Sequence, residues 1–151
     1  MTANCLIDTN ILVYVYDRSE PAKQALALAL LRQMPYSGAG AISTQTLAEF
    51  YNAVTRRLKE NLSPAEAYER LQNLEQSWPV ITVTPAVVLE AARGAQQHRL
   101  NFWDALIWAT AKLNQIPVVL SEDFNLGSAI EGIRFINPLQ QGFDLLTLMS
   151  N

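Results

Sequence analysis

Four acidic residues of this chain lie where a carboxylate is unfavourable. Each adjoins or interrupts an apolar segment, and together they are Asp8, Glu49, Asp104 and Asp123. If the fold brought them within a few ångströms, their like charges would raise one another's pKa unless a cation neutralised them. A cluster of carboxylate oxygens without histidine is typical of sites for hard ions such as Mg²⁺ or Mn²⁺. The set therefore favours a metal-dependent enzyme that acts on phosphate compounds.

Each acid also has an ordinary structural interpretation. Asp8 could cap a helix, and Asp104, three residues after Asn101, could belong to a capping box. Glu49 could be a solvated helix residue, and Asp123 could form an Asx-turn after a strand. Glu122 could replace Asp123 as a ligand, although successive side chains of extended chain point to opposite sides. Only the convergence of all four would distinguish a site from these alternatives.

Short apolar runs alternate with helical patterns along the chain. The runs that predict strands are residues 5–8, 41–43, 80–83, 118–121 and 133–136. This alternation predicts an α/β domain with a parallel sheet, and the continuous apolarity suits strands that are covered on both faces.

The starts of several helices are marked by capping residues. Ser63 and Glu66 form a capping-box pattern with proline at the first helical position, and Thr84 precedes another proline. Asn101 is a candidate N-cap for a helix over residues 102–114. A stripe of apolar residues with helical spacing runs through residues 47–58, which include Glu49.

This order of elements predicts where the acids meet. In open α/β sheets, ligands bind outside the carboxyl ends of the strands, where the following helices begin. Asp8 and Asp123 follow predicted strands, Asp104 lies in the first turn of a predicted helix, and Glu49 lies in the second turn after residues 41–43. We therefore expect all four at one edge of the sheet.

The composition sets further bounds. A chain of 151 residues, half of them hydrophobic, predicts a single domain over residues 1–151. The single cysteine excludes an internal disulfide and favours a cytoplasmic setting. No secretory signal pattern opens the sequence, and no apolar run reaches the ~20 residues that span a membrane, so no membrane partner is expected. The net charge of −3 argues against a broad basic surface for nucleic acid.

Other candidate residues are fewer. Arg56 lies seven residues after Glu49, almost on the same helical face, so it could contact a substrate phosphate or be a solvated helix end. His98 is the only histidine and is interpreted as a solvated helix-end residue, not a general base. No serine-hydrolase elbow or phosphate-binding glycine motif is present. Five aromatic residues are interpreted as core or interface in preference to base-stacking platforms: Phe50, Tyr51, Phe102, Trp103 and Trp108.

The sequence around the acids resembles that of the PIN-domain nucleases, and among them the VapC-like toxins of bacterial toxin–antitoxin pairs. The family's acidic quartet falls on Asp8, Glu49, Asp104 and Asp123. The resemblance implies a Rossmann-like three-layer α/β/α sandwich around a parallel sheet of about five strands. The matching segments are Leu6-Ile7-Asp8-Thr9-Asn10-Ile11-Leu12, Ser43-Thr44-Gln45-Thr46-Leu47-Ala48-Glu49-Phe50-Tyr51, Phe102-Trp103-Asp104-Ala105-Leu106-Ile107, Leu120-Ser121-Glu122-Asp123-Phe124 and Ile133-Arg134-Phe135-Ile136-Asn137-Pro138.

The same resemblance implies roles for neighbouring residues. Thr9, Asn10 and Ser121 would shape the site; serine stands at 121 where the family often has threonine, and tryptophan at 103 where tyrosine is frequent. The implied function is a Mg²⁺- or Mn²⁺-dependent endoribonuclease, the toxin of a toxin–antitoxin pair. An RNA substrate, a small antitoxin protein and a homodimer are the implied partners. The alternatives are a nuclease specific for DNA or for a nucleic-acid structure, and a PIN-like module that binds RNA or protein without catalysis.

Overall fold

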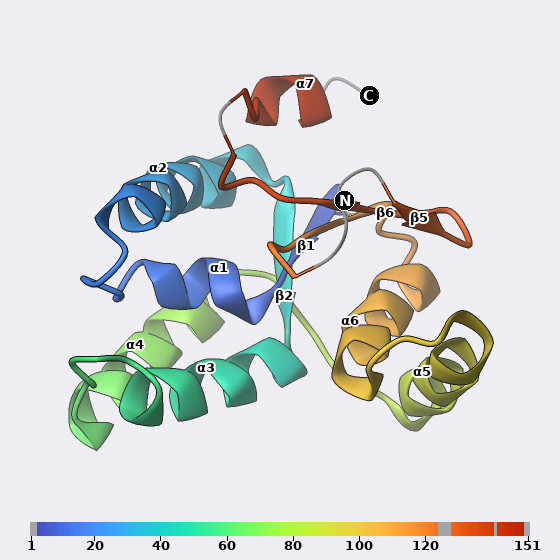
Figure 1. Ribbon diagram of the computed structural model, residues 1–151, viewed down its shortest axis with the longest axis horizontal. Coiled ribbons are helices and arrows are strands. Elements are labelled where there is room, and N and C mark those ends of the chain that lie inside the picture. Colours follow the sequence, from blue (N-terminus) through green and yellow to red (C-terminus); the bar gives the residue numbers. More distant parts are fainter. Residues whose placement is uncertain (1–2, 124–127, 141, 150–151) are drawn as a thin grey trace.

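A six-stranded sheet runs through the part of the chain that the computed structural model describes, which is residues 3–123, 128–140 and 142–149 (Figure 1). The strand order is β3-β2-β1-β4-β6-β5. All neighbours are parallel except β5 and β6, which are antiparallel. The strands are β1 (Cys5–Ile7), β2 (Gly40–Ser43), β3 (Val80–Ile81), β4 (Val118–Leu120), β5 (Ala129–Ile130) and β6 (Ile133–Ile136).

All five predicted strands are confirmed, and β5 is an addition to them. It forms a hairpin with β6 through Glu131 and Gly132, whose φ angles of 48° and 88° are both in the left-handed region. Turns with two such residues match the twist of the strands that they join. Phe124, the last residue of one family-like segment, lies outside the described residues.

The helices begin where the capping residues predict. Ser63 and Glu66 form a complete capping box at α4, and the Thr84 side chain accepts a hydrogen bond from the Val87 N–H at α5. Asn101 caps α6 through the Trp103 N–H. The helices are α1 (Thr9–Tyr14), α2 (Pro21–Ser37), α3 (Thr44–Arg56), α4 (Pro64–Ser77), α5 (Pro85–His98), α6 (Phe102–Leu113) and α7 (Leu145–Met149).

Alternating residues of the central strands divide the core into two apolar clusters. Cys5 and Ile7 of β1 pack with buried residues of α1, α2, α3 and α4, whereas Leu6 packs with those of α5 and α6. Figure 1 shows these two groups of helices on opposite sides of the sheet. Because the side chains of a strand alternate between its two faces, the three residues of β1 contribute to both clusters. The predicted three-layer α/β/α architecture is confirmed.

The two central strands bring distant parts of the sequence to one edge of the sheet. β1 and β4 are parallel neighbours with Ile7 opposite Leu120, and the Asp8 N–H donates to the Leu120 carbonyl oxygen over 2.9 Å. The chain turns into α1 directly after β1, so Asp8 lies at the carboxyl end of the sheet. None of the helices in the described part of the chain has the length and apolar character needed to cross a membrane.

Candidate active site

Asp8 lies at the junction of β1 and α1 and is 8% exposed. Its Oδ1 accepts a hydrogen bond from the Thr9 N–H over 2.7 Å, so Asp8 is the N-cap of α1, as the ordinary interpretation predicted. Its Oδ2 accepts a hydrogen bond from the Ser121 hydroxyl, also over 2.7 Å. The side chain thus caps a helix and presents a charge at the edge of the sheet.

Ser121, directly after β4, connects three parts of this edge. Besides donating to Asp8, its Oγ accepts hydrogen bonds from Asn10 Nδ2 over 3.3 Å and from the Asp123 N–H over 3.1 Å. The hydrogen bond to Asp8 is buried, and the other two are partly buried. Asn10 and Ser121, both expected to shape the site, therefore fix Asp8 relative to the backbone of Asp123.

Glu49 reaches the same region from the second turn of α3. Ser43 caps this helix by accepting from the Thr46 N–H over 3.2 Å, which fixes where the helix begins. The Glu49 carboxylate accepts from Thr9 Oγ1 over 3.2 Å and from Gln45 Nε2 over 2.7 Å. Thr9 thus joins the expected site by holding a second acid.

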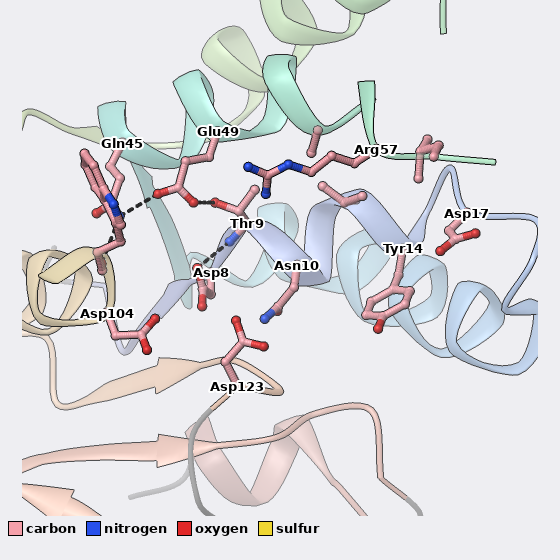
Figure 2. Close-up of a pocket in the computed structure, with 14 residues that line it drawn as sticks. Asp8, Thr9, Asn10, Tyr14, Asp17, Gln45, Glu49, Arg57, Asp104 and Asp123 are labelled. Carbon is pink, nitrogen blue, oxygen red and sulfur yellow. Dashed lines mark hydrogen bonds between the residues drawn. The ribbon is translucent and has the colours of Figure 1, made fainter. Parts of the chain in front are cut away.

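Asp104 and Asp123 complete the set. Asp104 lies half-buried in the first turn of α6, and the capping box that Asn101 could have formed with it is absent from the described contacts. Neither carboxylate accepts a hydrogen bond from any residue in the described ranges. The four acids line one pocket, and Figure 2 shows their carboxylates arranged around a common space. The predicted convergence is therefore observed.

Burial, and to a smaller extent repulsion by neighbouring acids, makes the charges of Asp8 and Asp104 unfavourable. Burial raises the pKa of Asp8 to about 7, with smaller contributions from the charges of Asp123 and Glu49, while the hydrogen bonds from Ser121 and the Thr9 N–H oppose the rise. The pKa of Asp104 is also raised, first by burial and then by Asp123 and Glu49. A nearby cation would reverse both effects.

The donor set fits a hard divalent cation in kind. All four charged groups are carboxylates, and two buried amide oxygens of the pocket, Asn10 Oδ1 and Gln45 Oε1, have no hydrogen-bond partner among the described residues. Such acceptors suit the water molecules of a hydrated ion. As placed, however, no three acidic, histidine or cysteine side chains of the described ranges stand close enough to hold one ion. The carboxylates would have to approach one another to share it.

The structure places Arg57, not Arg56, at the pocket. Arg56 is the last residue of α3 and is exposed, and it does not line the pocket, whereas Arg57 does. Figure 2 shows the Arg57 guanidinium directed towards Glu49 and Thr9. Helical spacing puts Arg56 two turns along α3 from Glu49, and it does not line the pocket, whereas Arg57, the C-cap of the helix, does. Arg57 is therefore the arginine that a phosphate in the pocket would meet.

Several pocket residues were not predicted. Gln45 contacts Glu49 and lies four residues before it on α3, so the i, i+4 spacing could have identified it. Tyr14 and Asp17 also line the pocket. Glu122 turns away from it, because its carboxylate pairs with Lys23 over 3.1 Å and accepts from the Tyr14 hydroxyl. Asp123, not Glu122, is therefore the acid of this segment that faces the pocket.

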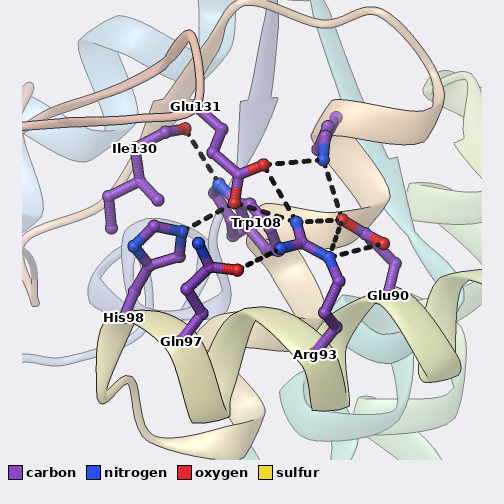
Figure 3. A network of polar contacts seen from close by, with 8 residues as sticks. Glu90, Arg93, Gln97, His98, Trp108, Ile130 and Glu131 are labelled. Atoms are coloured by element: carbon purple, nitrogen blue, oxygen red, sulfur yellow. Dashed lines mark hydrogen bonds and ion pairs between the residues drawn. The ribbon is translucent and has the colours of Figure 1, made fainter.

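His98 lies in a different polar network, which ties α5 and α6 to the β5–β6 hairpin (Figure 3). Its Nε2 contacts Glu131 over 2.6 Å, and Glu131 also pairs with Arg93 over 2.8 Å and with Lys112 over 3.0 Å. Arg93 and Lys112 share Glu90 as a second partner. His98 is the last residue of α5, as expected, but its ring is partly buried and contacts Glu131 instead of being fully solvated. It does not line the acidic pocket.

Comparison with known proteins identifies the family. The PIN-domain model matches residues 5–129, most of the chain, and the chain therefore belongs to the PIN-domain family. The resemblance to VapC-like proteins is confirmed at the level of family and fold. No curated protein matches the sequence.

Solved structures share the fold at low sequence identity. A chain of a toxin–antitoxin complex from Klebsiella pneumoniae is 21% identical with a TM-score of 0.63, over 89% of this chain and 97% of that one. VapC20 of Mycobacterium tuberculosis, described as a sarcin-ricin loop cleaving toxin, is 19% identical with a TM-score of 0.65, over 84% and 97%. A chain of VapBC2 from Rickettsia felis bound to a promoter DNA fragment is 16% identical with a TM-score of 0.60, over 87% and 96%.

Proposed function

We propose that this protein is a divalent-metal-dependent endoribonuclease and the toxin of a toxin–antitoxin pair in the cytoplasm. The observation that carries the proposal is the single pocket lined by Asp8, Glu49, Asp104 and Asp123. Two of these carboxylates, Asp8 and Asp104, have raised pKa values, and neither has a cationic partner among the described residues that would hold it charged. Membership of the PIN-domain family supports hydrolysis of a nucleic acid.

Each residue would have a defined part. Asp8 and Asp104 would hold Mg²⁺ or Mn²⁺, and Glu49 and Asp123 would complete the shell, orient water or hold a second ion. When bound, the ion supplies Lewis acidity towards the scissile phosphate and activates water. Ser121 keeps Asp8 in position, and Thr9 and Gln45 do the same for Glu49. Arg57 is proposed to contact a substrate phosphate.

The products expected from this scheme carry a 5′-phosphate and a 3′-hydroxyl. No side chain has to form a covalent intermediate, because water is the nucleophile. The 2′-hydroxyl takes no part in such a reaction, so the acids by themselves do not select RNA over DNA. The preference for RNA is supported by the description of VapC20 as a toxin that cleaves the sarcin-ricin loop.

The test is cleavage of matched RNA and DNA oligonucleotides by the purified protein in Mg²⁺, in Mn²⁺ and in EDTA. We expect RNA to be cut only with a divalent ion, and Asp104→Asn and Asp123→Asn to abolish cleavage while the circular dichroism spectrum is retained. Glu122→Gln is the matched control, because this neighbouring acid is paired with Lys23 outside the pocket. RNA cleavage by the Asp104→Asn variant would refute the assignment.

Two alternatives have distinct outcomes in the same experiment. Cutting of DNA in preference to RNA would indicate a DNA nuclease of the same chemistry. Failure to cut either, together with no heat of Mg²⁺ or Mn²⁺ binding in calorimetry, would indicate a binding module.

The partners proposed are a small antitoxin and a second copy of the chain. Three similar structures are described as a toxin–antitoxin complex or as VapBC proteins bound to DNA, which supports an antitoxin partner. Light scattering of the purified chain tests the homodimer and co-purification with the product of an adjacent gene tests the antitoxin. The organisation of residues 1–151 as one domain stays a prediction.

A further inference from the structure

Trp103 differs from the other two tryptophans in its exposure. Trp78 and Trp108 are 7% and 0% exposed, whereas Trp103 is 60% exposed. It lies in the first turn of α6, directly before Asp104. Of the two structural interpretations of Trp103, core or interface, its exposure excludes the core. A large exposed aromatic surface beside a pocket is typical of a place where a ligand or partner binds.

Hydrogen bonds fix Trp103 relative to the acids. Its N–H donates to Asn101 Oδ1 over 2.9 Å, and its carbonyl oxygen accepts from Gln45 Nε2 over 3.0 Å. Gln45 also donates to Glu49 Oε1 over 2.7 Å, so one amide group joins the Trp103 backbone to a proposed metal ligand. The Phe102 ring packs edge to face against the indole, with centroids 5.3 Å apart. The ring is held in place while most of it remains exposed.

The surface around Trp103 extends the acidic pocket. Trp103 lines that pocket together with the four acids, and it lines two adjoining hollows as well. One hollow contains Val83 and Leu106, and the other contains Asn52 and Arg57. An extended ligand whose phosphate lay among the acids would therefore meet an aromatic face next to it and an arginine on the same side.

We propose that Trp103 is a stacking platform for an unpaired base beside the scissile phosphate. This inference rests on the proposed nuclease function. A base in a duplex already has neighbours on both faces, whereas an unpaired base can cover an indole ring. Stacking on aromatic side chains accepts any base, and Arg57 supplies a charge for the adjacent backbone.

Intrinsic fluorescence tests the platform without measuring cleavage, because Trp103 is the exposed tryptophan. Single-stranded RNA of about ten nucleotides is titrated with Ca²⁺ in place of Mg²⁺, and its integrity is checked on a gel. We expect the emission to be quenched by the single strand and not by a duplex of the same sequence. Trp103→Phe should abolish the quenching, since the remaining tryptophans are buried.

Kinetics provide the second readout. Trp103→Phe keeps an aromatic face and should retain cleavage. Trp103→Ala should raise KM by about 5- to 160-fold, the range expected for one stacked base, with a smaller change in kcat. Leu113→Ala is the matched control, because Leu113 is 46% exposed at the far end of the same helix and should behave as wild type.

The outcomes separate this proposal from the nuclease function. RNA cleavage without any quenching of Trp103 would overturn the stacking role and leave the nuclease intact. Quenching without cleavage would support the platform and refute the nuclease. A blue shift of the Trp103 emission that grows with protein concentration, without RNA, would show a second copy covering the ring and would overturn the platform.

Discussion

The Ser121 hydroxyl donates a hydrogen bond to Asp8 Oδ2 over 2.7 Å, although the two residues are 113 positions apart in the sequence. The contact joins the ends of the neighbouring strands β1 and β4 at the pocket. Because both residues are buried, the hydrogen bond stabilises a carboxylate that has lost most of its water. It is the larger of the two hydrogen-bond contributions that oppose the rise in the pKa of Asp8.

Ser121→Ala should therefore weaken metal binding and cleavage. Removing the hydroxyl raises the pKa of Asp8 further and leaves its Oδ2 free to turn from the pocket. Loss of a group that orients a metal ligand typically lowers affinity or activity by about 10- to 100-fold. The measurement is the Mg²⁺ concentration required for half-maximal cleavage. Ser121→Thr keeps the hydroxyl and should restore most of the activity; equal activity of the alanine variant and wild type would contradict the role.

Asp8→Asn should abolish cleavage yet raise the melting temperature of the metal-free protein at about pH 8. The folded-state pKa of Asp8 is about 7, above its ordinary value of 3.8. The contribution of Asp8 to the stability of the folded protein is therefore greatest below pH 3.8, and it is lost as the pH rises through about 7. Asparagine avoids that loss and still caps α1.

Thermal melts in EDTA and in Mg²⁺ measure this effect. Mg²⁺ should stabilise wild type more than Asp8→Asn, since binding to the folded state alone raises stability. A lower melting temperature of the variant in EDTA would contradict the burial argument.

Arg57→Ala should weaken binding to RNA, whereas Arg56→Ala should not. The two substitutions remove the same charge from adjacent positions, but only Arg57 lines the pocket. We expect a severalfold rise in KM for Arg57→Ala. The slope of the logarithm of RNA affinity against the logarithm of salt concentration should also become shallower by about one. Equal effects of both variants would show that the overall charge, and not the position of Arg57, governs binding.

Glu131→Gln should lower stability near neutral pH and have less effect in acid. Hydrogen bonds from His98, Arg93 and Lys112 lower the pKa of Glu131 to about 2 from its ordinary 4.5. The ionised Glu131 side chain therefore stabilises the folded protein fully above about pH 4.5, and this stabilisation is lost as the pH falls towards 2. Because the network is partly exposed, we expect a loss of about 1 kcal/mol at neutral pH.

Chemical denaturation at several pH values checks this, and the difference from wild type should narrow as the pH falls. Glu60→Gln is the control, since its pair with Arg18 is almost fully exposed and should contribute little. A difference that widens in acid would refute the sign of the effect.

The four acids could be placed from the sequence because parallel topology puts strand ends and helix starts at one edge. Asp8 and Asp123 follow β1 and β4, and Asp104 begins α6, so little beyond the order of elements was needed. Arg57 could not be placed in this way. Helical periodicity stops at Arg56, and the φ of Arg57 is −111°, so its side-chain direction depends on the loop that follows.

Features that depend on tertiary contacts were also missed. β5 has only two residues and is defined by its pairing with β6. The turn between them lacks the Asn-Gly or Asp-Gly pair that would predict a hairpin from the sequence. The network around Glu131 joins residues from α5, α6 and that hairpin. The exposure of Trp103 depends on where the pocket lies relative to the first turn of α6. The spacing of residues in the sequence does not determine this.

The central place of β1 affects when the pocket can form during synthesis. One neighbour of β1 is β2, which follows it early in the chain, but the other is β4, which is completed only at Leu120. A nascent polypeptide still attached to the ribosome and shorter than this has neither Ser121 to hold Asp8 nor Asp123 beside it. The set of carboxylates can therefore assemble only after residue 123 has been translated.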